Sequence, residues 1–252
     1  MTQAWRIGRW ALLLAVAGCG GGGSDPVVLP PGHFTQGIWR GSAVLDGQDL
    51  GLVVGMIAAS GQANLILFAG DSQLRGNVES DGAALDTAFS GLSLFGVSGD
   101  FSERYEVDGG TVAAGASLTA ELTGSLSGRP LTLDLQYDTR YERPASFGVM
   151  AGVWRRELDG HFLEWQIDAS GLLAGTDSNG CAYAGQVTIP DPTRNLYRMS
   201  YQITGCYSSA LQVDGQAVLD DGAAAGDTLH SAGTGALGPL NIDSFVERLT
   251  RQ

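Results

Sequence analysis

Hydrophobic and polar residues alternate along many short segments of this chain, which is the pattern of half-buried β-strands. Residues 131–137, Leu-Thr-Leu-Asp-Leu-Gln-Tyr, place every apolar side chain on one face. Glycine-containing turn signals such as Asp46-Gly47 and Asp159-Gly160 separate such segments. Short alternating segments joined by tight turns predict an all-β fold in which successive strands form an antiparallel meander.

The pattern predicts strands in both halves of the chain. In the first half they are 52–58, 63–69, 73–78, 84–89, 117–122 and 131–137. In the second half they are 162–168, 172–176, 181–188, 196–203, 209–213 and 216–219.

An internal repeat organises these strands. Gly-Ile-Trp-Arg at 37–40 recurs as Gly-Val-Trp-Arg at 152–155, a spacing of 154 − 39 = 115 residues. This period is too long for a solenoid repeat but suits one small barrel or sandwich domain. We therefore expect two tandem antiparallel meander β-barrels, at 37–145 and 146–252. Trp39 and Trp154 should fill the closed ends of their barrels, and the short aromatic joint between the copies should let the barrels pack together.

The N-terminal segment has the pattern of an export signal. Residues 1–18 combine two arginines with an apolar run too short to span a bilayer. Val16-Ala17-Gly18-Cys19 resembles the bacterial lipobox, which implies cleavage before Cys19 and its acylation, including palmitate. An ordinary signal peptide with a chance cysteine is the alternative. Residues 19–36, rich in Gly and Pro, form a predicted tether.

The same resemblance implies where the protein resides. An acidic residue after a lipobox cysteine favours the inner membrane, and Gly20 is not acidic, so the outer membrane is expected. Several acyl chains give stable anchoring. Without residues 1–18 the chain has 12 Arg and 27 acidic residues, 12 − 27 = −15. An anionic bilayer surface repels such a body, so we expect the membrane to be contacted only through the lipid.

Composition excludes several functions. All 14 basic residues are Arg, so lysine-dependent phosphate loops, Schiff bases and Ser-x-x-Lys pairs are excluded. The acidic balance argues against nucleic acid as a partner. No G-x-S-x-G or metal-binding His motif occurs, and the three histidines, His33, His161 and His230, are far apart. We predict no catalytic residues, no metal and no cofactor.

Two cysteines remain after lipidation, Cys181 and Cys206. In an exported chain such a pair predicts one disulfide between neighbouring strands. A metal or redox pair is the alternative, but neither CxxC spacing nor a nearby His supports it. Asp177-Ser178-Asn179-Gly180 resembles part of a calcium loop but lacks the other ligands, so a turn is expected.

Gly-x-Trp at the start of an eight-stranded meander resembles lipocalin-like (calycin-like) barrels. That resemblance implies an arginine near the last strand packed on the Trp, and Arg248 is the candidate for Trp154. Residues 137–220 also resemble uncharacterised proteobacterial secreted proteins and lipoproteins, which have no agreed activity. The shared motifs are Tyr-x-Arg-Pro-x-Ser at 141–146, Asp-Ala-Ser-Gly at 168–171, Gly-Cys-x-Tyr-x-Gly at 180–185 and Asn-x-Tyr at 195–197.

Aromatic residues of the second copy could line a ligand site at a barrel mouth, or they could be core and rim packing. The candidates are Trp165, Tyr183, Tyr197 and Tyr201. We expect a non-enzymatic, outer-membrane-anchored lipoprotein that binds a small apolar ligand or a partner protein. A structural or accessory envelope lipoprotein with filled barrels is an alternative, and a carboxylate-dependent hydrolase is a further one.

Overall fold

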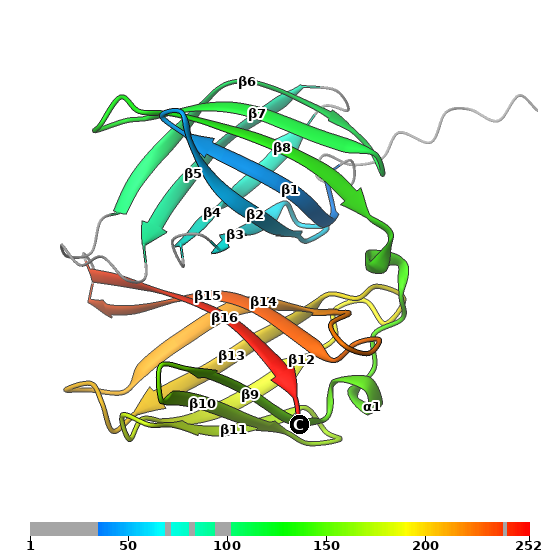
Figure 1. Cartoon of the computed structure of the whole chain (residues 1–252), viewed down its shortest axis with the longest axis vertical. Coiled ribbons are helices and arrows are strands. Elements are labelled where there is room, and N and C mark those ends of the chain that lie inside the picture. The colour runs from blue at the N-terminus through cyan, green and yellow to red at the C-terminus, as the bar shows by residue number, and fades with distance from the viewer. Residues whose placement is uncertain (1–34, 69–71, 81–83, 94–101, 239–240) are drawn as a thin grey trace, which may run out of the picture.

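The computed structural model describes residues 35–68, 72–80, 84–93, 102–238 and 241–252. Two closed antiparallel barrels, one after the other along the chain, make up this part (Figure 1). The predicted fold class is therefore confirmed. The described residues begin at Thr35, so Cys19 and all but the last two residues of the predicted tether 19–36 lie outside them.

Eight strands form the first barrel, each paired with its neighbours in chain order. They are β1 (Gly37–Leu45), β2 (Gln48–Ile57), β3 (Gln62–Leu67), β4 (Ser72–Ser80), β5 (Leu85–Ser93), β6 (Ser102–Ala113), β7 (Ser117–Gly124) and β8 (Pro130–Asp138). Pairing of β1 with β8 closes this barrel. A 3-10 turn, η2 (Thr139–Glu142), and a short helix, α1 (Phe147–Met150), lead to the second barrel.

The second barrel repeats this order, and pairing of its first and last strands closes it. Its strands are β9 (Gly152–Leu158), β10 (His161–Ile167), β11 (Leu172–Asp177), β12 (Ala182–Thr188), β13 (Tyr197–Thr204), β14 (Leu211–Asp220), β15 (Thr228–Gly238) and β16 (Asn241–Arg251). The two segments predicted at 209–213 and 216–219 form one strand, β14, in which Gly215 pairs with Gly233. Asp214-Gly215 is thus not a turn.

The two copies match in their turns. Asp46-Gly47 and Asp159-Gly160 both have positive φ at each residue, 51° and 79° in the first and 52° and 81° in the second. Two positive φ values define the tight hairpin turn that suits strand twist, and Asp-Gly tolerates them well. The duplication inferred from sequence thus extends to backbone conformation.

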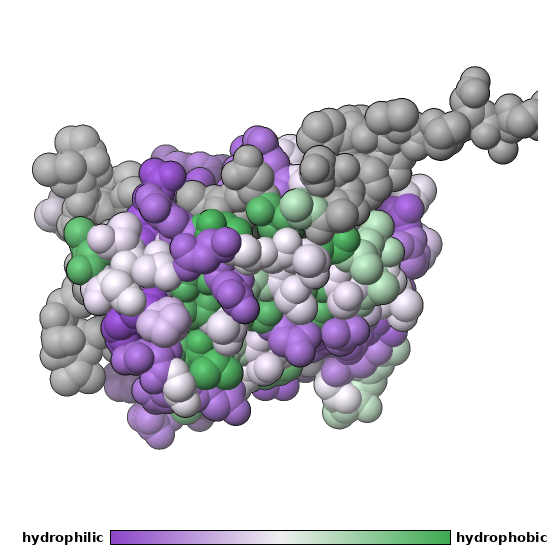
Figure 2. All heavy atoms as spheres, turned by 90° about the horizontal axis from the view of Figure 1, so that it is seen from above, coloured by the Kyte–Doolittle hydropathy of each residue, from purple (hydrophilic) through white to green (hydrophobic). Residues whose placement is uncertain are grey.

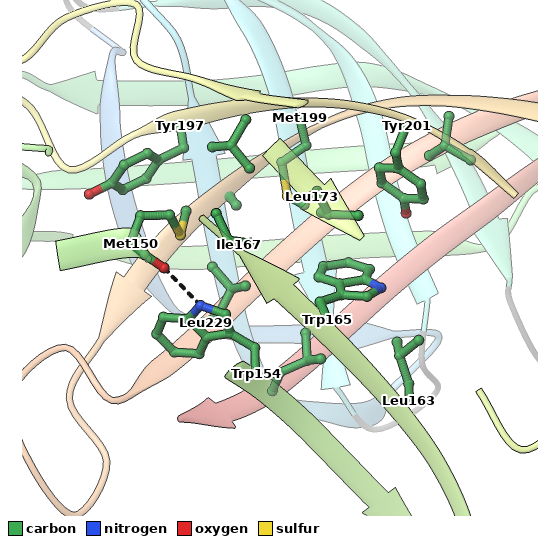
Figure 3. Packing of buried hydrophobic residues seen from close by; sticks show 14 of the residues in the cluster. Met150, Trp154, Leu163, Trp165, Ile167, Leu173, Tyr197, Met199, Tyr201 and Leu229 are labelled. Carbon is green, nitrogen blue, oxygen red and sulfur yellow. Dashed lines mark hydrogen bonds between the residues drawn. The ribbon is translucent and has the colours of Figure 1, made fainter. Parts of the chain in front are cut away.

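The repeated tryptophans match as well. Trp39 and Trp154 are both fully buried in their barrel cores. Each indole Nε1 donates to the carbonyl oxygen four residues earlier. Trp39 donates to Thr35 at 2.8 Å, and Trp154 donates to Met150 at 2.9 Å, the bond drawn in Figure 3. Each tryptophan therefore fixes the segment that precedes the first strand of its barrel.

The residue that covers Trp154 differs from the expected one. Arg248 is exposed, so its predicted packing on Trp154 is wrong. Arg251 lies over Trp154 instead, with its guanidinium carbon 4.3 Å from the ring centroid. In the first barrel Tyr137 packs edge-on against Trp39, at 5.5 Å between ring centroids. A cation–π contact in one copy thus replaces an aromatic pair in the other.

The two barrels pack against each other through β2–β4 on one side and β14–β16 on the other (Figure 1). The apolar part of this interface consists of outward-facing side chains that are at most 7% exposed: Ile38, Val54, Met56, Ile66, Tyr141, Leu196, Val218, Ala232 and Val246. Removal of this apolar surface from water stabilises the pair as one body. The predicted packing of the two copies is present in the structure.

The opposite face of the first barrel is different in character. Figure 2 shows this face from above, with hydrophilic residues spread over it and hydrophobic ones in small patches. Outward positions of β7 and β8, such as Glu121, Asp134 and Gln136, are exposed. The outward positions of β7 and β8, which the second barrel does not cover, are therefore polar.

A cluster of ionisable side chains, buried or partly buried, crosses the interface, and we call it the ion-pair clamp: Arg40, Asp138, Arg140, Asp220 and His230. Asp220 of β14 accepts from both arginines, which also pair with Asp138. His230 Nε2 lies 3.0 Å from Asp220 Oδ2. Both carboxylates are under 10% exposed. Because each carboxylate meets both arginines, the clamp joins the first barrel, the joint and the second barrel.

The clamp makes stability depend on pH. Burial lowers the pKa of His230, although the hydrogen bond to Asp220 opposes this effect. The unfolded chain then takes up a proton near pH 6.5 that the folded chain does not. Stability should therefore fall as pH decreases below about 6.5. Urea unfolding at pH 7.5 and pH 5.5 measures this change, and His230→Gln should reduce it. An equal change in the variant would contradict the assignment to His230.

Candidate functional site

Three of the four aromatic residues predicted to line a site meet inside the second barrel, and Figure 3 shows two of them, Trp165 and Tyr201. Trp165, Tyr183 and Tyr201 form a triangle with ring centroids 5.5 to 6.2 Å apart, and we call these three the aromatic triad. Tyr197 does not join them. It lies near Met150 and α1, where its hydroxyl accepts from the Ser146 amide at 3.3 Å. Tyr197 therefore belongs to the core at the α1 end.

Alternation along the strands explains why the aromatic triad points inward. Trp165 lies two residues from Leu163 and from Ile167, which are both in the same core. Tyr201 follows Met199 in the same way on β13. Side chains two residues apart share a face of a strand, so these residues meet inside the barrel.

Glycines on the neighbouring strands leave room for these rings. Gly175 pairs with Trp165, and a Cβ at Gly175 would come within 2.5 Å of the indole. The first barrel has the opposite arrangement, because Gly55 occupies the position of Trp165 and Leu65 occupies that of Gly175. The large and small side chains have thus exchanged strands, and only the second barrel places an indole here.

Charged groups lie beside the aromatic triad. Arg156 Nη1 pairs with Glu247 Oε2 at 3.0 Å. The Tyr183 hydroxyl donates to Asp177 Oδ2 at 2.9 Å. Asp177 also accepts from the backbone amides of Asn179 and Cys181, so it organises the predicted turn. Sequence reasoning missed Arg156 and Glu247, although Arg156 lies two residues after Trp154 on the same strand face.

The tyrosines of the aromatic triad remain neutral over the physiological range. Burial raises the pKa of Tyr201 well above its usual value, and the nearby Glu247 carboxylate adds to this effect. Burial also raises the pKa of Tyr183, with a further contribution from its hydrogen bond to Asp177. Both phenols therefore keep their protons and cannot act as bases near neutral pH.

One polar atom in the aromatic triad has no partner. The indole Nε1 of Trp165 is buried and makes no hydrogen bond within the described residues. By contrast, Trp39 and Trp154 each donate to a backbone carbonyl. An unpaired buried donor costs about 1–3 kcal/mol of stability. This indole is therefore a group that an incoming hydrogen-bond acceptor would stabilise.

A disulfide lies at the same end of the barrel. Cys181 and Cys206 are bonded, as the sequence predicts. Cys181 directly precedes β12, and Cys206 follows the end of β13 by two residues, so the bond joins the ends of two paired strands. Closing a loop of 25 residues stabilises the fold by about 3.5 kcal/mol in chain-entropy terms.

Other sequence candidates occupy structural positions. His161 Nδ1 lies 3.1 Å from Ser178 Oγ beside a hairpin, and His230 belongs to the clamp. His33 falls outside the described residues. Within the described ranges, no group of three His, Cys, Asp or Glu side chains could hold a metal ion. Among these residues there is also no helix long and apolar enough to cross a membrane.

Comparison with known proteins adds little to this picture. No protein-family model and no curated protein matches the chain. A solved structure from Bacteroides fragilis, described as a "putative outer membrane protein", is similar to it over 86% of this chain and 97% of that chain. The sequence identity is 10% and the TM-score is 0.31. A similarity this low carries no conclusion about the function of this chain.

Proposed function

We propose that this chain is a non-enzymatic, lipid-anchored protein of the bacterial envelope whose second barrel binds a small molecule at the aromatic triad. The lipobox resemblance at Cys19 supports the anchor. The unpaired, buried Nε1 of Trp165 supports the binding site, because it is the polar atom of the triad that only an added partner would satisfy.

The chemistry of the site limits the ligand. Three aromatic faces favour a flat, apolar body. The Trp165 indole can only donate, so the ligand needs a hydrogen-bond acceptor such as a carbonyl oxygen. Arg156 and Glu247 already pair with each other, and Asp177 already accepts hydrogen bonds from Tyr183 and two backbone amides, so the ligand needs no charge of its own.

Entry would occur past the outer tyrosines. Trp165 and Tyr201 are almost fully buried, whereas Tyr183 and Tyr207 are only partly buried and pack against the same core. A ligand would therefore displace these two side chains before it reached the indole. Such rotations at an edge are small and fast compared with opening of the barrel.

A titration with Nile red tests the binding site. This neutral dye has a flat apolar body and a carbonyl oxygen. Dye emission should rise and shift to the blue with one-to-one saturation. Trp165→Phe keeps an aromatic ring but removes the donor, so it should weaken binding about 5-fold. Trp39→Phe, the same change in the other barrel, should not weaken it. No saturable binding, or equal effects of both variants, would contradict the site.

The anchor is tested separately. Cys19→Ser removes the acylated thiol, so the variant should lose palmitate labelling and move from the membrane to the soluble fraction. Cys206→Ser controls for loss of a cysteine elsewhere and should still be labelled. A Cys19→Ser protein that still takes up palmitate and sediments with membranes would disprove lipidation at this residue.

An accessory role in the envelope is the second candidate. It is favoured by the dense interior of the second barrel, where Trp154, Trp165 and Tyr197 are at most 1% exposed. Filled barrels would serve as rigid contact modules held away from the bilayer. In that case Nile red would not saturate and the anchor would remain.

A further inference from the structure

The outer face of the second barrel carries a second feature, whose main side chains lie on the opposite face of the strands from the aromatic triad. An open hollow of about 640 Å³ lies over β12, β13 and β14. Figure 1 shows these three strands as neighbours in the second barrel. We call this region the outer hollow. Its main side chains are Gln186, Arg198, Ser200, Gln202, Gln212 and Asp214.

Strand register explains how these residues gather. Ser200 on β13 pairs with Gln186 on one side and with Asp214 on the other. Gln202 pairs with Gln212 in the next outward row. The central residue, Ser200, is short and only partly buried. The residues around it are exposed, and all of them except Asp214 are long: Gln186, Arg198, Gln202 and Gln212. A short side chain at the centre with long ones around it produces a concave surface on the outer face of the barrel.

Two charges in the outer hollow remain unpaired. Neither Arg198 nor Asp214 forms an ion pair with any described residue. Most other arginines of the described chain do pair, including Arg40, Arg140, Arg143, Arg155 and Arg156. One amide is already oriented, because Gln212 Nε2 donates to Ser200 Oγ at 2.9 Å.

The outer hollow thus combines one cation, one anion and three carboxamides. Its local charge is zero on a protein of formal net charge −13. Neutrality excludes the strong attraction that polyanions would need. A carboxylate accepts from two hydroxyl groups at once, a guanidinium donates to ring or hydroxyl oxygens, and a carboxamide does both. The vicinal hydroxyl groups of a neutral sugar both donate and accept hydrogen bonds, so they can pair with all three kinds of side chain.

We infer that the outer hollow binds a neutral carbohydrate chain, with Asp214 and Arg198 contacting adjacent hydroxyl groups and Gln202 and Gln212 extending the contact along the chain. The hollow is open, and Tyr201, the aromatic residue of its lining, is buried, so affinity for each sugar unit is low. Contact with several units compensates for this. The anchored body would then hold a glycan beside the barrels.

The test uses the unlipidated Cys19→Ser protein with chitohexaose, maltohexaose and cellohexaose as probes. Titration calorimetry should show saturable binding of at least one of them. Amide NMR shifts should concentrate on β12–β14. Asp214→Ala should weaken binding about 10-fold, because it removes a charged hydrogen-bond acceptor. Gln202→Ala should weaken binding less, and Gln136→Ala, an exposed glutamine on the first barrel, should leave it unchanged.

These variants lie on exposed positions, so their thermal unfolding should match that of the parent protein. Trp165→Phe should bind the sugars normally, which separates this inference from the proposed function. A dissociation constant of roughly 10 mM is taken as the weakest affinity of interest. If no sugar saturates the protein at about that concentration, the inference is overturned. Binding that Asp214→Ala does not change, or shifts at the barrel ends, would overturn it as well.

Discussion

Trp39→Ala and Trp154→Ala should each lower the free energy of unfolding by about 3–5 kcal/mol. Both indoles are fully buried, and each holds the segment before its barrel through a hydrogen bond. Truncation therefore leaves a cavity and frees a buried carbonyl oxygen at the same time. Such a loss is a large part of the stability of a typical domain.

Urea unfolding followed by circular dichroism measures this effect. Leu126→Ala is the control, because this side chain is 79% exposed and its loss should change stability by less than about 0.5 kcal/mol. If either tryptophan variant were as stable as this control, that indole could not be a core residue of a closed barrel.

The second large effect concerns the ion-pair clamp. Asp220→Ala should cost about 3–5 kcal/mol, because it leaves two arginines at the interface with Asp138 as their one remaining carboxylate and removes the partner of His230. Burial alone would raise the pKa of Asp220, but the hydrogen bond from His230 and the charge of Arg40 outweigh it and hold the pKa well below its usual value. The carboxylate is therefore charged wherever the protein is folded near neutral pH.

The neighbouring residue supplies a matched control. Asp221 pairs with Arg143, but this pair is on the surface, where both side chains are at least a third exposed. Asp221→Ala should therefore cost less than about 1 kcal/mol. Equal losses in the two variants, measured by urea unfolding at pH 7.5, would show that the clamp does not hold the barrels together.

Much of the fold could be predicted from local sequence signals. Repeated Gly-x-Trp segments, two Asp-Gly turns and strict alternation at 131–137 depend on nearby residues only, and all of them appear as expected. Asp214-Gly215 has the same two residues as these turns but lies in the middle of β14. A Cβ at Gly215 would come within 2.7 Å of Gly233 on the neighbouring strand, so glycine is needed here for close strand packing and not for a turn.

The register of the last strand could not be predicted. Phe245, Val246 and Leu249 give β16 apolar residues on both faces, so alternation does not identify the inward face. A shift of one residue exchanges the two faces. In the structure Phe245, Leu249 and Arg251 face inward, whereas Arg248 faces outward. The barrel interface explains this ambiguity, because Val246 is buried there on the outer face.

The candidate site was predicted only in part for a similar reason. An aromatic residue at an inward strand position predicts a buried side chain. It does not predict how far along the barrel axis that side chain lies. Tyr197 and Tyr201 lie on the same face of β13, yet only Tyr201 reaches Trp165. The ion pair of Arg156 and Glu247 joins the first and last strands of the barrel, so no local pattern could reveal it.

Indole NMR signals provide the most direct test of the proposed binding site. After removal of residues 1–18 the chain retains three tryptophans, Trp39, Trp154 and Trp165, and hence three indole N–H signals. Addition of Nile red should shift the signal that is missing in Trp165→Phe, because its free donor gains an acceptor. The other two indoles keep their carbonyl partners and should not move. A Trp165 signal that stays in place while the dye binds would contradict the account.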